Sequence, residues 1–573
     1  MPRWRACGLR LIAALGLGVA QAASIAWWGH GQAVWWLQLL SLAGLVALLH
    51  HHADTVLREP APDTWPQQAA ASRWRRTWLG LRRSGSLQAF GWGWLYATAW
   101  LTATVWWLFI SMHVYGGLAA PLAALAVLAL AAFLALYYGV AAAAYHRMLR
   151  ALRARGLQDR VRAAWWLPLA FAALWTLAEW ARGTWLTGFP WGATGYAHVD
   201  GPLVSLAPWV GVYGMGWVAA WWAALLAAVL VRLASGTRPT APGLRGLALT
   251  TSQTMALAGS LAACAVLGLV HGGFTRPTGE LSVQLLQGNI PQDEKFEFGP
   301  GINRSLAWYG QALQSSTAPL VVTAETAIPL LPTQLPTRYW QAIQAPFTQP
   351  GSARAAIVAV PLGSIEAGYT NSVRTFAAGP AGQYRYDKHH LVPFGEFIPA
   401  GFHWFVRMMN IPLGDFQRGA LPQPPLAWQG ERIAPNICYE DLFGEEIGAG
   451  FGDAATAPTV LLNLSNIAWF GDSIAIDQHL AISRLRALEF ERPMLRATNT
   501  GTTALIDHTG RVVRALPRLT AGVLDVTVQG RDGRTPYARW VAPWGLWPLV
   551  LACLGLLAGA LWRLQLWGRQ ADV

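Results

Sequence analysis

Charged residues are scarce in this sequence, which argues against an ordinary soluble protein. Asp, Glu, Lys and Arg make up only 12% of the 573 residues, whereas soluble domains contain about a quarter. Hydrophobic residues make up 54%, and there are 33 tryptophans, a residue enriched where a membrane meets water. The length allows roughly two to four domains. We therefore predict a membrane protein with a soluble part.

Cysteine is also rare, and its placement excludes a disulfide scaffold. Three of the four cysteines, Cys7, Cys264 and Cys553, lie inside long apolar segments, whereas such a scaffold needs close, paired cysteines. Only Cys438 lies in a polar region. A lone cysteine outside the membrane is a candidate nucleophile, although burial as an inert thiol is the commoner fate of a cysteine.

Signatures of metal and serine chemistry are missing. The sequence has no GxSxG motif, so a serine hydrolase is not predicted. His389 and His390 are adjacent, so on a strand they would point to opposite faces, and no spaced carboxylate or cysteine completes a zinc site. Either histidine could serve a Cys–His dyad, but the local signatures of papain-like enzymes are absent. We predict no metal and no cofactor.

Long apolar runs, by contrast, are abundant. A helix that spans a bilayer needs about 20 mostly apolar residues. Eight stretches approach or exceed this length, and they predict about eight spans, at 7–27, 32–51, 88–111, 118–145, 164–182, 204–232, 252–272 and 543–563.

The net charge of +13 comes from 42 basic and 29 acidic residues. Most arginines fall in alternate short loops, so we interpret them as orientation signals and predict no nucleic-acid binding. Both termini are then cytoplasmic, and the segment between the last two spans lies outside. This organisation predicts a membrane domain at 1–272, a soluble domain at 273–542, and a last span with its tail at 543–573.

The soluble segment has the pattern of an α/β domain, because short β-branched runs alternate with helical patterns. The predicted strands are 281–288, 319–324, 355–361, 371–377, 432–438, 459–464, 494–499 and 502–507. The predicted helices are 301–316, 336–346 and 477–491.

The loop at 179–196 is expected on the same side of the membrane as the soluble domain. It begins with Glu179 and Arg182 at the end of an apolar span. Ionisable groups at such depth are costly and often functional. The alternative is an ordinary interfacial loop in which the two residues pair with each other.

Reactive side chains occur where three predicted strands end: Glu325, then Lys388 and Glu396, then Cys438. Strand ends are where α/β sheets collect their sites. A carboxylate can take a proton from a thiol as it attacks a carbonyl, and an ammonium can stabilise the resulting oxyanion. The set is therefore sufficient for acyl transfer. Structural roles stay open: a surface acid at Glu325, a Lys388–Asp387 pair and a core thiol at Cys438.

The ordered motifs resemble those of the apolipoprotein N-acyltransferase family, the membrane-embedded branch of the nitrilase superfamily. The resemblance covers nearly the whole chain. Its segments are FGWGW (90–94), EWARG with GFPW (179–191), LLQGNIPQ (285–292), ETAIP (325–329), DKHHLVPFGEFIP (387–399), NICYEDLF (436–443), SNIAWFGDS (465–473) and 478–507.

The resemblance implies a nitrilase-like αββα sandwich and a catalytic triad of Glu325 as base, Lys388 as stabiliser of the tetrahedral intermediate and Cys438 as nucleophile. Further active-site positions that it implies are Glu396, Tyr439 and Glu440. Residues expected at the lipid entrance are Phe296, Trp469 and Phe416. The apolar stretch 402–412 is expected to form that entrance, a mobile cover, or plain core.

Two motifs depart from the family pattern. Ala324 and Thr326 flank the base where Pro and Ser are usual, which leaves the base intact. Ile467 follows Ser465-Asn466 where Asp is usual. The change at Ile467 puts in doubt any acid at that position but not the triad.

The implied reaction moves an acyl chain from a phospholipid, typically phosphatidylethanolamine, through a thioester on Cys438. The acceptor is the N-terminal α-amine of an S-diacylglyceryl-cysteine lipoprotein, in the last step of bacterial lipoprotein maturation. The expected location is the inner membrane, with the catalytic domain in the periplasm, and the expected state is a monomer. Two rival hypotheses are a tethered amidase for small soluble amides and a non-catalytic transporter or lipid-binding protein.

Overall fold

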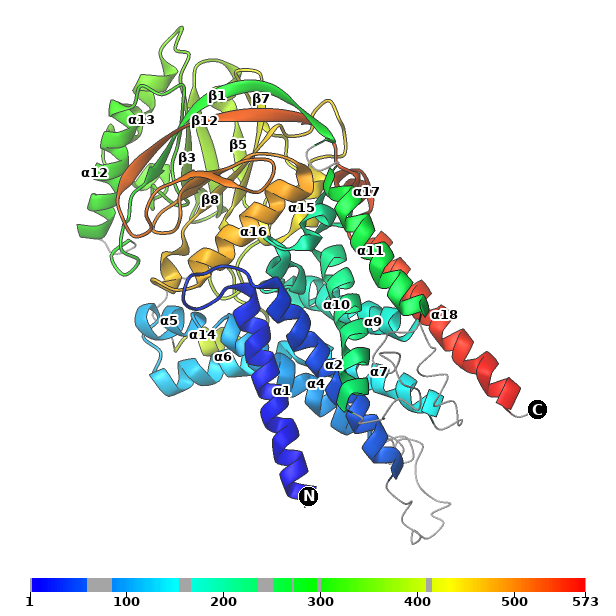
Figure 1. Cartoon of the computed structure of the whole chain (residues 1–573). Helices are drawn as coiled ribbons and strands as arrows, with labels where there is room; N and C mark the ends of the chain where they lie inside the picture. Colours follow the sequence, from blue (N-terminus) through cyan, green and yellow to red (C-terminus); the bar gives the residue numbers. More distant parts are fainter. Residues whose placement is uncertain are drawn as a thin grey trace.

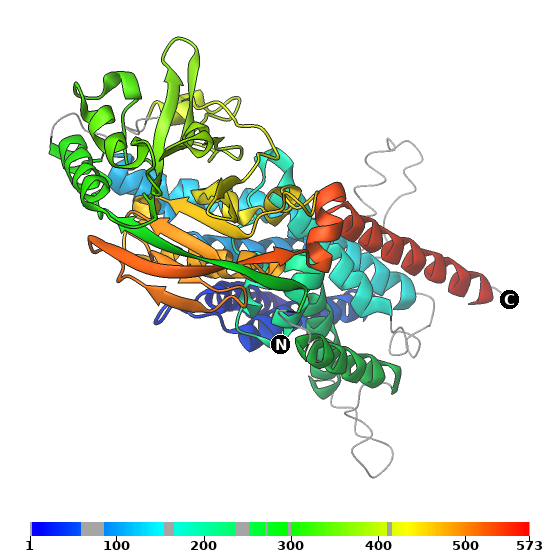
Figure 2. The ribbon, with the colours of Figure 1, turned by 90° about the horizontal axis from the view of Figure 1, so that it is seen from above.

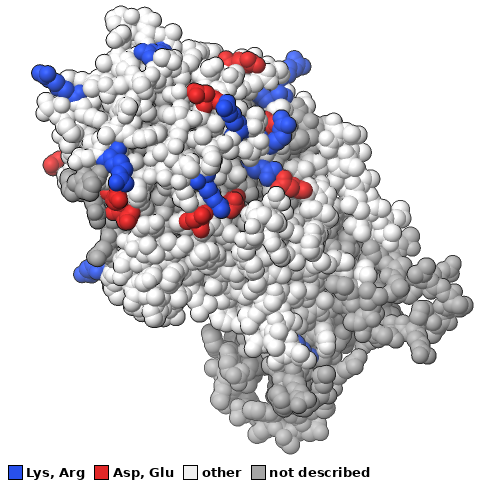
Figure 3. All heavy atoms as spheres, turned by 60° about the vertical axis from the view of Figure 1, so that its left-hand side comes forward, with Lys and Arg blue, Asp and Glu red and all other residues white. Residues whose placement is uncertain are grey.

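A helical region and an α/β domain lie one against the other in the computed structural model (Figure 1). The structure describes residues 3–58, 85–153, 166–234, 251–269, 273–295, 300–408 and 415–571. On the face shown in Figure 3, charged side chains gather over the α/β domain, and the described surface of the helical region is almost free of them. This distribution suits a domain in water above helices in lipid.

Each of the eight predicted apolar stretches coincides with one helix or with two consecutive helices. These are α1 (Arg3–Ile25), α2 (Trp35–Arg58), α4 (Ser86–Thr104), α5 (Leu108–Ile110), α6 (Ala120–Leu134), α7 (Leu136–Arg153), α9 (Trp166–Thr184), α10 (Ala207–Ala234), α11 (Thr251–Leu269) and α18 (Trp547–Ala571). Within the described ranges, four helical stretches are long and apolar enough to cross a membrane, or five if one bent pair is a single span. The protein is thus a membrane protein with several candidate spans, and the number eight stays a prediction.

The predicted stretch 88–111 is bent rather than straight. Helix α4 ends at Thr104, and the next helical segment, from Leu108 to Tyr115, departs by 63°. The break frees the carbonyl of Thr104, and Gln478 of the α/β domain donates to it at 3.1 Å. The amide oxygen of Gln478 accepts the indole N–H groups of Trp107 and Trp191 at 3.0 and 2.8 Å. A side chain distant in sequence therefore compensates the break, which explains why periodicity alone did not predict it.

The α/β domain contains two six-stranded sheets packed face to face. Their orders are β12-β1-β2-β3-β4-β5 and β11-β10-β9-β8-β7-β6. The strands are β1 (Thr275–Gln287), β2 (Leu320–Val322), β3 (Ala355–Ser364), β4 (Gly368–Ala377), β5 (Arg385–Asp387), β6 (Leu426–Trp428), β7 (Glu431–Ile437), β8 (Val460–Ser465), β9 (Met494–Thr498), β10 (Ala504–Ile506), β11 (Val512–Ala515) and β12 (Gly522–Gly533). All eight predicted strands are confirmed.

Helices cover both outer faces of the paired sheets, which completes the predicted αββα sandwich (Figures 1 and 2). Helices α12 (Pro300–Ser315) and α13 (Tyr339–Thr348) pack on the first sheet, and α16 (Ala475–Phe490) packs on the second. The apolar core between the sheets contains Leu285, Val322, Ile357, Ile437 and Leu462, all fully buried. This core holds the strand ends that carry the reactive residues.

Four strands were not predicted: β5, β6, β11 and β12. Three of them are only three or four residues long, too short for a periodic signal. The fourth, β12, pairs antiparallel with β1 along nearly its whole length. Its buried residues Leu524, Val526 and Val528 alternate with exposed ones, so the period of two was present in the sequence. From β12 the chain returns to the helical region through α17 (Pro536–Trp544).

The outer helix α16 also packs against the helical region. The α/β domain therefore contacts the helical region directly and is not joined to it by the chain alone. Helix α10 is interrupted at Gly211, whose φ of +64° is not helical. The backbone N–H of the next residue, Val212, donates to Glu489 Oε1 on α16 at 2.7 Å. Glu489 is held in turn by Arg486 at 3.0 Å. The kink thus leaves a backbone N–H of α10 without an intrahelical partner, and Glu489 of the α/β domain accepts from it.

Candidate active site

Glu325 lies three residues beyond the end of β2 and is only 6% exposed. Its Oε1 atom accepts from Lys388 Nζ at 3.2 Å and from Asn371 Nδ2 at 2.9 Å. Its Oε2 atom accepts the backbone N–H of Asn466 at 2.8 Å. Both oxygens therefore face donors, which is the environment of an ionised carboxylate.

Lys388 follows β5 directly and is 1% exposed. Its ammonium is shared between Glu325 and Glu396, the latter at 3.0 Å. Burial lowers the pKa of Lys388, but the two carboxylates outweigh it and raise the pKa above its usual range. Burial conversely raises the pKa of Glu325, and the ammonium groups of Lys388 and Lys295 with hydrogen bonds bring it below its usual value. Lys388 and Glu325 therefore form a charged pair. The alternative in which Lys388 pairs with Asp387 does not occur, because Asp387 pairs with Arg385.

Cys438 comes directly after β7 and opens the helical turn Cys438–Leu442. Its φ of +53° lies in the left-handed region, which is costly for a residue with a side chain and concentrates at functional sites. The thiol is half-buried, and Ser465 Oγ lies 3.5 Å from Sγ. Burial raises the pKa of Cys438 to about 12, helped by Glu325 and opposed by Lys388. At neutral pH the group is therefore a thiol that needs a base.

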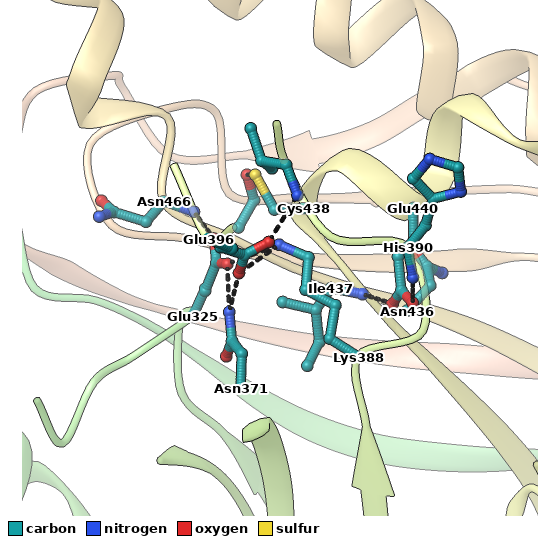
Figure 4. Close-up of polar contacts among 12 residues, drawn as sticks. Glu325, Asn371, Lys388, His390, Glu396, Asn436, Ile437, Cys438, Glu440 and Asn466 are labelled. Atoms are coloured by element: carbon teal, nitrogen blue, oxygen red, sulfur yellow. Dashed lines mark hydrogen bonds and ion pairs between the residues drawn. The ribbon is translucent and has the colours of Figure 1, made fainter. Parts of the chain in front are cut away.

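Figure 4 shows Glu325, Lys388, Glu396 and Cys438 gathered together. They come from the ends of β2, β5 and β7 and from the turn after residue 392. Glu396 is 8% exposed, and its Oε2 atom accepts the backbone N–H of Val392 at 2.8 Å. Polar side chains that sequence reasoning missed hold this group.

Asn371 and Lys295 are two of the buried side chains that sequence reasoning missed. Asn371 Nδ2 donates to both Glu325 and Glu396, at 2.9 and 2.8 Å. Lys295 is 1% exposed, and its Nζ atom donates to the backbone carbonyl of Glu325 at 3.0 Å. Asn371 is the first residue of a predicted strand, and Lys295 lies in a run of charged residues that is typical of a surface loop. Neither position carries a local signal of function.

Glu440 lies behind the site and joins two of its segments. One carboxylate oxygen accepts the backbone N–H groups of His389 and His390, at 2.6 and 3.1 Å. The other accepts from Ile437 N–H at 2.6 Å and from Tyr386 Oη at 2.8 Å. Burial raises the pKa of Glu440, against these hydrogen bonds and Lys388, which lower it. Its carboxylate thus fixes the segment after β5 to the turn that holds the thiol.

Tyr439 points away from the reactive group toward the helical region. Its hydroxyl donates to the carbonyl of Gly188 at 3.1 Å. His390 binds the same loop, with Nε2 at 2.9 Å from the carbonyl of Thr187, and its Nδ1 atom lies 2.8 Å from Glu446. His389 Nδ1 instead lies 2.8 Å from the carbonyl of Gly419. The adjacent histidines thus have separate surroundings, and within the described ranges no group of three or more His, Cys, Asp or Glu side chains could hold a metal.

The residues expected at a lipid entrance are spread around the site. Trp469 is half-buried, edge to face with Tyr115 of the helical region at 6.0 Å between ring centres. Phe416 packs edge to face on Tyr369 at 4.9 Å, and its N–H donates to the carbonyl of Glu396 at 3.0 Å. Phe296 lies outside the described residues.

The expected entrance segment 402–412 is described as far as residue 408. Phe402 and Trp404 are 44% and 60% exposed, while Val406 is buried with Leu118 and Ala123 of the helical region. This segment therefore has an exposed apolar side and a side packed on helix α6.

Glu179 and Arg182 are both buried but bind different partners. Glu179 Oε1 accepts from the N–H and hydroxyl of Thr194, at 2.7 and 2.6 Å. Arg182 donates to the carbonyls of Phe189 and Trp191, at 2.6 and 2.8 Å. The alternative of an i, i+3 ion pair is therefore not what the structure shows, because the loop that follows supplies a separate set of hydrogen bonds to each residue.

The architecture and the family comparisons define the class of protein. Residues 282–537 match the family described as carbon-nitrogen hydrolase, so the sandwich is a nitrilase-type domain. Residues 17–225 match the family described as apolipoprotein N-acyltransferase N-terminal domain. The chain is therefore a nitrilase-type domain joined to a dedicated helical membrane region.

Three relatives match nearly the whole chain, and all are described as apolipoprotein N-acyltransferases. The protein from Verminephrobacter eiseniae (strain EF01-2) is 51% identical over 93% of this chain and 92% of its own. The protein from Ralstonia nicotianae is 46% identical over 91% and 89%, and that from Bordetella bronchiseptica is 43% identical over 83% and 88%. The chain belongs to the apolipoprotein N-acyltransferase family. It is a membrane enzyme of nitrilase type whose function is the N-acylation of lipoproteins.

Proposed function

We propose that Cys438 is the nucleophile, Glu325 the general base and Lys388 the stabiliser of the oxyanion in a two-step acyl transfer. The observation that supports these roles best is the single ammonium of Lys388, shared by Glu325 and Glu396 beside the strained turn of Cys438. The donor in this proposal is a membrane phospholipid, such as phosphatidylethanolamine. The acceptor is the N-terminal α-amine of a diacylglyceryl lipoprotein.

In the first step the Cys438 thiol attacks the ester carbonyl of the phospholipid while Glu325 takes the thiol proton. Because the pKa of Cys438 is raised to about 12, the proton moves as the carbon–sulfur bond forms, so no free thiolate accumulates. The oxyanion collapses, the ester carbon–oxygen bond breaks, and Glu325 returns its proton to the departing lysophospholipid oxygen. A thioester on Cys438 remains.

In the second step the lipoprotein amine attacks the thioester carbonyl, and Glu325 accepts a proton from the amine nitrogen. The carbon–sulfur bond breaks, the proton passes to Sγ, and the product is an N-acylated lipoprotein. Both substrates reside in a bilayer, so the chemistry requires the site to face a membrane surface. The exposed apolar side chains Phe402 and Trp404 support an entrance at this position.

The intact mass of the purified protein after incubation with phospholipid vesicles tests the proposed triad. The wild-type protein should gain one acyl chain, and the adduct should disappear after neutral hydroxylamine. Cys438→Ala should gain none, and Glu325→Gln and Lys388→Met should acylate at least a hundredfold more slowly. Normal acylation of Cys438→Ala would contradict the proposal.

In this proposal the protein is a monomer in the bacterial inner membrane. Residues 1–272 form the membrane domain, residues 273–542 lie in the periplasm, and residues 543–573 form the last span and its tail. The alternate arginine-rich loops support this orientation. A membrane-impermeant maleimide should label Asp453→Cys, an exposed position, in intact spheroplasts. Ser72→Cys should react only after lysis, and the reverse pattern would overturn the orientation.

A further inference from the structure

Lys295 is a second ammonium buried against the proposed base, on the loop that follows β1. It is 1% exposed, and Nζ donates to the backbone carbonyl of Glu325 at 3.0 Å. A buried ammonium is costly unless it is paired with negative charge or well hydrogen-bonded. The position of Lys295 therefore raises the question of which anions its charge balances.

The charges of the site answer that question. Glu325 and Glu396 share one ammonium, that of Lys388, so these three groups together carry one excess negative charge when ionised. An excess negative charge opposes any step that places further negative charge on Sγ or on an acyl oxygen. Lys295 brings the sum of the four groups to zero. Its charge interacts favourably with both Glu325 and Cys438.

The protonation state of Lys295 is consistent with this role. Burial lowers the pKa of Lys295 to about 8, and Glu325 and Cys438 oppose that lowering. The ammonium form therefore predominates at neutral pH. Among the groups of the site, Glu325 and Cys438 are the two whose charges act on Lys295.

We propose that Lys295 is a positioning residue that holds the Glu325 segment by its carbonyl and supplies the second positive charge of the acyl-transfer site. This inference rests on the proposed roles of Glu325 and Cys438. As the thiol proton moves to Glu325, one negative charge moves to the acyl oxygen. The charge of Lys295 keeps the site neutral before and after that transfer. If Lys295 had a purely structural role, it would need only the hydrogen bond to the carbonyl of Glu325.

Two variants separate charge from structure. Lys295→Arg keeps a positive charge and a donor, and Lys295→Met keeps the apolar stem and removes both. We expect Lys295→Met to form the acyl-enzyme about a hundredfold more slowly and Lys295→Arg to stay within about tenfold of the wild type. Arg304→Met is the matched control, because it removes a cation from the following helix, where Arg304 pairs with Glu294 and is half-exposed. It should acylate at the wild-type rate.

A lipid-free measurement distinguishes failure of this inference from failure of the proposed function. Iodoacetate carries a negative charge and iodoacetamide does not, so the ratio of their Cys438 alkylation rates reports positive charge near the thiol. We expect this ratio to fall in Lys295→Met and to stay near the wild-type value in Lys295→Arg, whereas a merely structural residue would change both rates equally and leave the ratio unchanged. An unchanged ratio in folded Lys295→Met, or equal defects in both variants, would overturn the role of Lys295. If the wild type alkylates normally but never gains an acyl chain, the proposed function fails instead.

Discussion

The carboxylate of Glu440 accepts the backbone N–H of His389 at 2.6 Å. This bond joins the residue after Lys388 to the turn that begins at Cys438. The same carboxylate accepts the N–H of Ile437, the residue before the thiol. One side chain thus sets the separation between the proposed nucleophile and the proposed oxyanion stabiliser without itself touching either of them.

Replacing Glu440 by Gln should therefore impair acylation rather than only stability. Four donors converge on the carboxylate, and the NH₂ group of Gln would face two of them. Hydrogen bonds to a charged group contribute about 1.5–3 kcal/mol each, so we expect about a hundredfold slower formation of the acyl-enzyme, measured by intact mass. Glu431→Gln, at the start of the strand β7 that leads to this turn, is the control. Glu431 accepts from Thr278 and Gly279 away from the site, so its loss should lower thermal stability and leave acylation within about threefold.

Asn371→Leu should move the acidic side of the pH profile of the acylation rate to higher pH. The amide of Asn371 donates to Glu325 and so helps to lower the pKa of that carboxyl. Without this donor the pKa of Glu325 rises, and a higher pH is needed to keep it as the base. The acylation rate of wild type and variant, measured between pH 5 and 9, checks this. A profile that falls in height but keeps its midpoint would show that Asn371 acts only by placing Glu396.

The Cys438 thiol should react with iodoacetamide far more slowly than an exposed cysteine at neutral pH. With a pKa raised to about 12, its thiolate fraction at pH 8 is on the order of 10⁻⁴. The alkylation rate should keep rising up to pH 10 without reaching a plateau. Lys388→Met removes the positive charge that lowers this pKa, so it should slow alkylation further. A plateau near pH 8.5 in the wild type would contradict the raised pKa.

Gly211→Ala should destabilise the interface between the catalytic domain and the helical region. Gly211 has φ of +64°, and a Cβ atom there would lie 2.5 Å from the ring of Tyr537 on α17. The left-handed conformation alone costs about 1–2 kcal/mol for a residue with a side chain, and the ring contact adds to it. We expect a lower melting temperature in detergent. Gly259→Ala is the matched control, because nothing lies within 4 Å of its added Cβ, and its melting temperature should be unchanged or slightly higher.

Much of the architecture was predictable because it depends on local pattern. The eight apolar stretches and the eight predicted strands all occur as helices and strands, since hydrophobic length and period report burial directly. The reactive residues Glu325, Lys388 and Cys438 were identified from motifs at strand ends. The short strands β5, β6 and β11 were missed because three or four residues carry no period.

Features that depend on contacts between distant segments were not predictable. The bend after Thr104 is compensated by Gln478, more than 370 residues away, and no window of sequence contains both. The same applies to Glu179 and Arg182, whose spacing suggested a pair but whose partners lie in the following loop.

By itself, the sequence determined which residues could carry acyl-transfer chemistry and which stretches could lie in lipid, because residue type and hydrophobic pattern are local properties. Only the tertiary structure decided that Asn371 and Lys295 belong to the same site, that Tyr439 faces the helical region, and that the pKa of Cys438 is raised. Those outcomes depend on burial and on charges brought together by packing of the two sheets. Electrostatic interactions follow distance in space, which the order of residues along the chain does not encode.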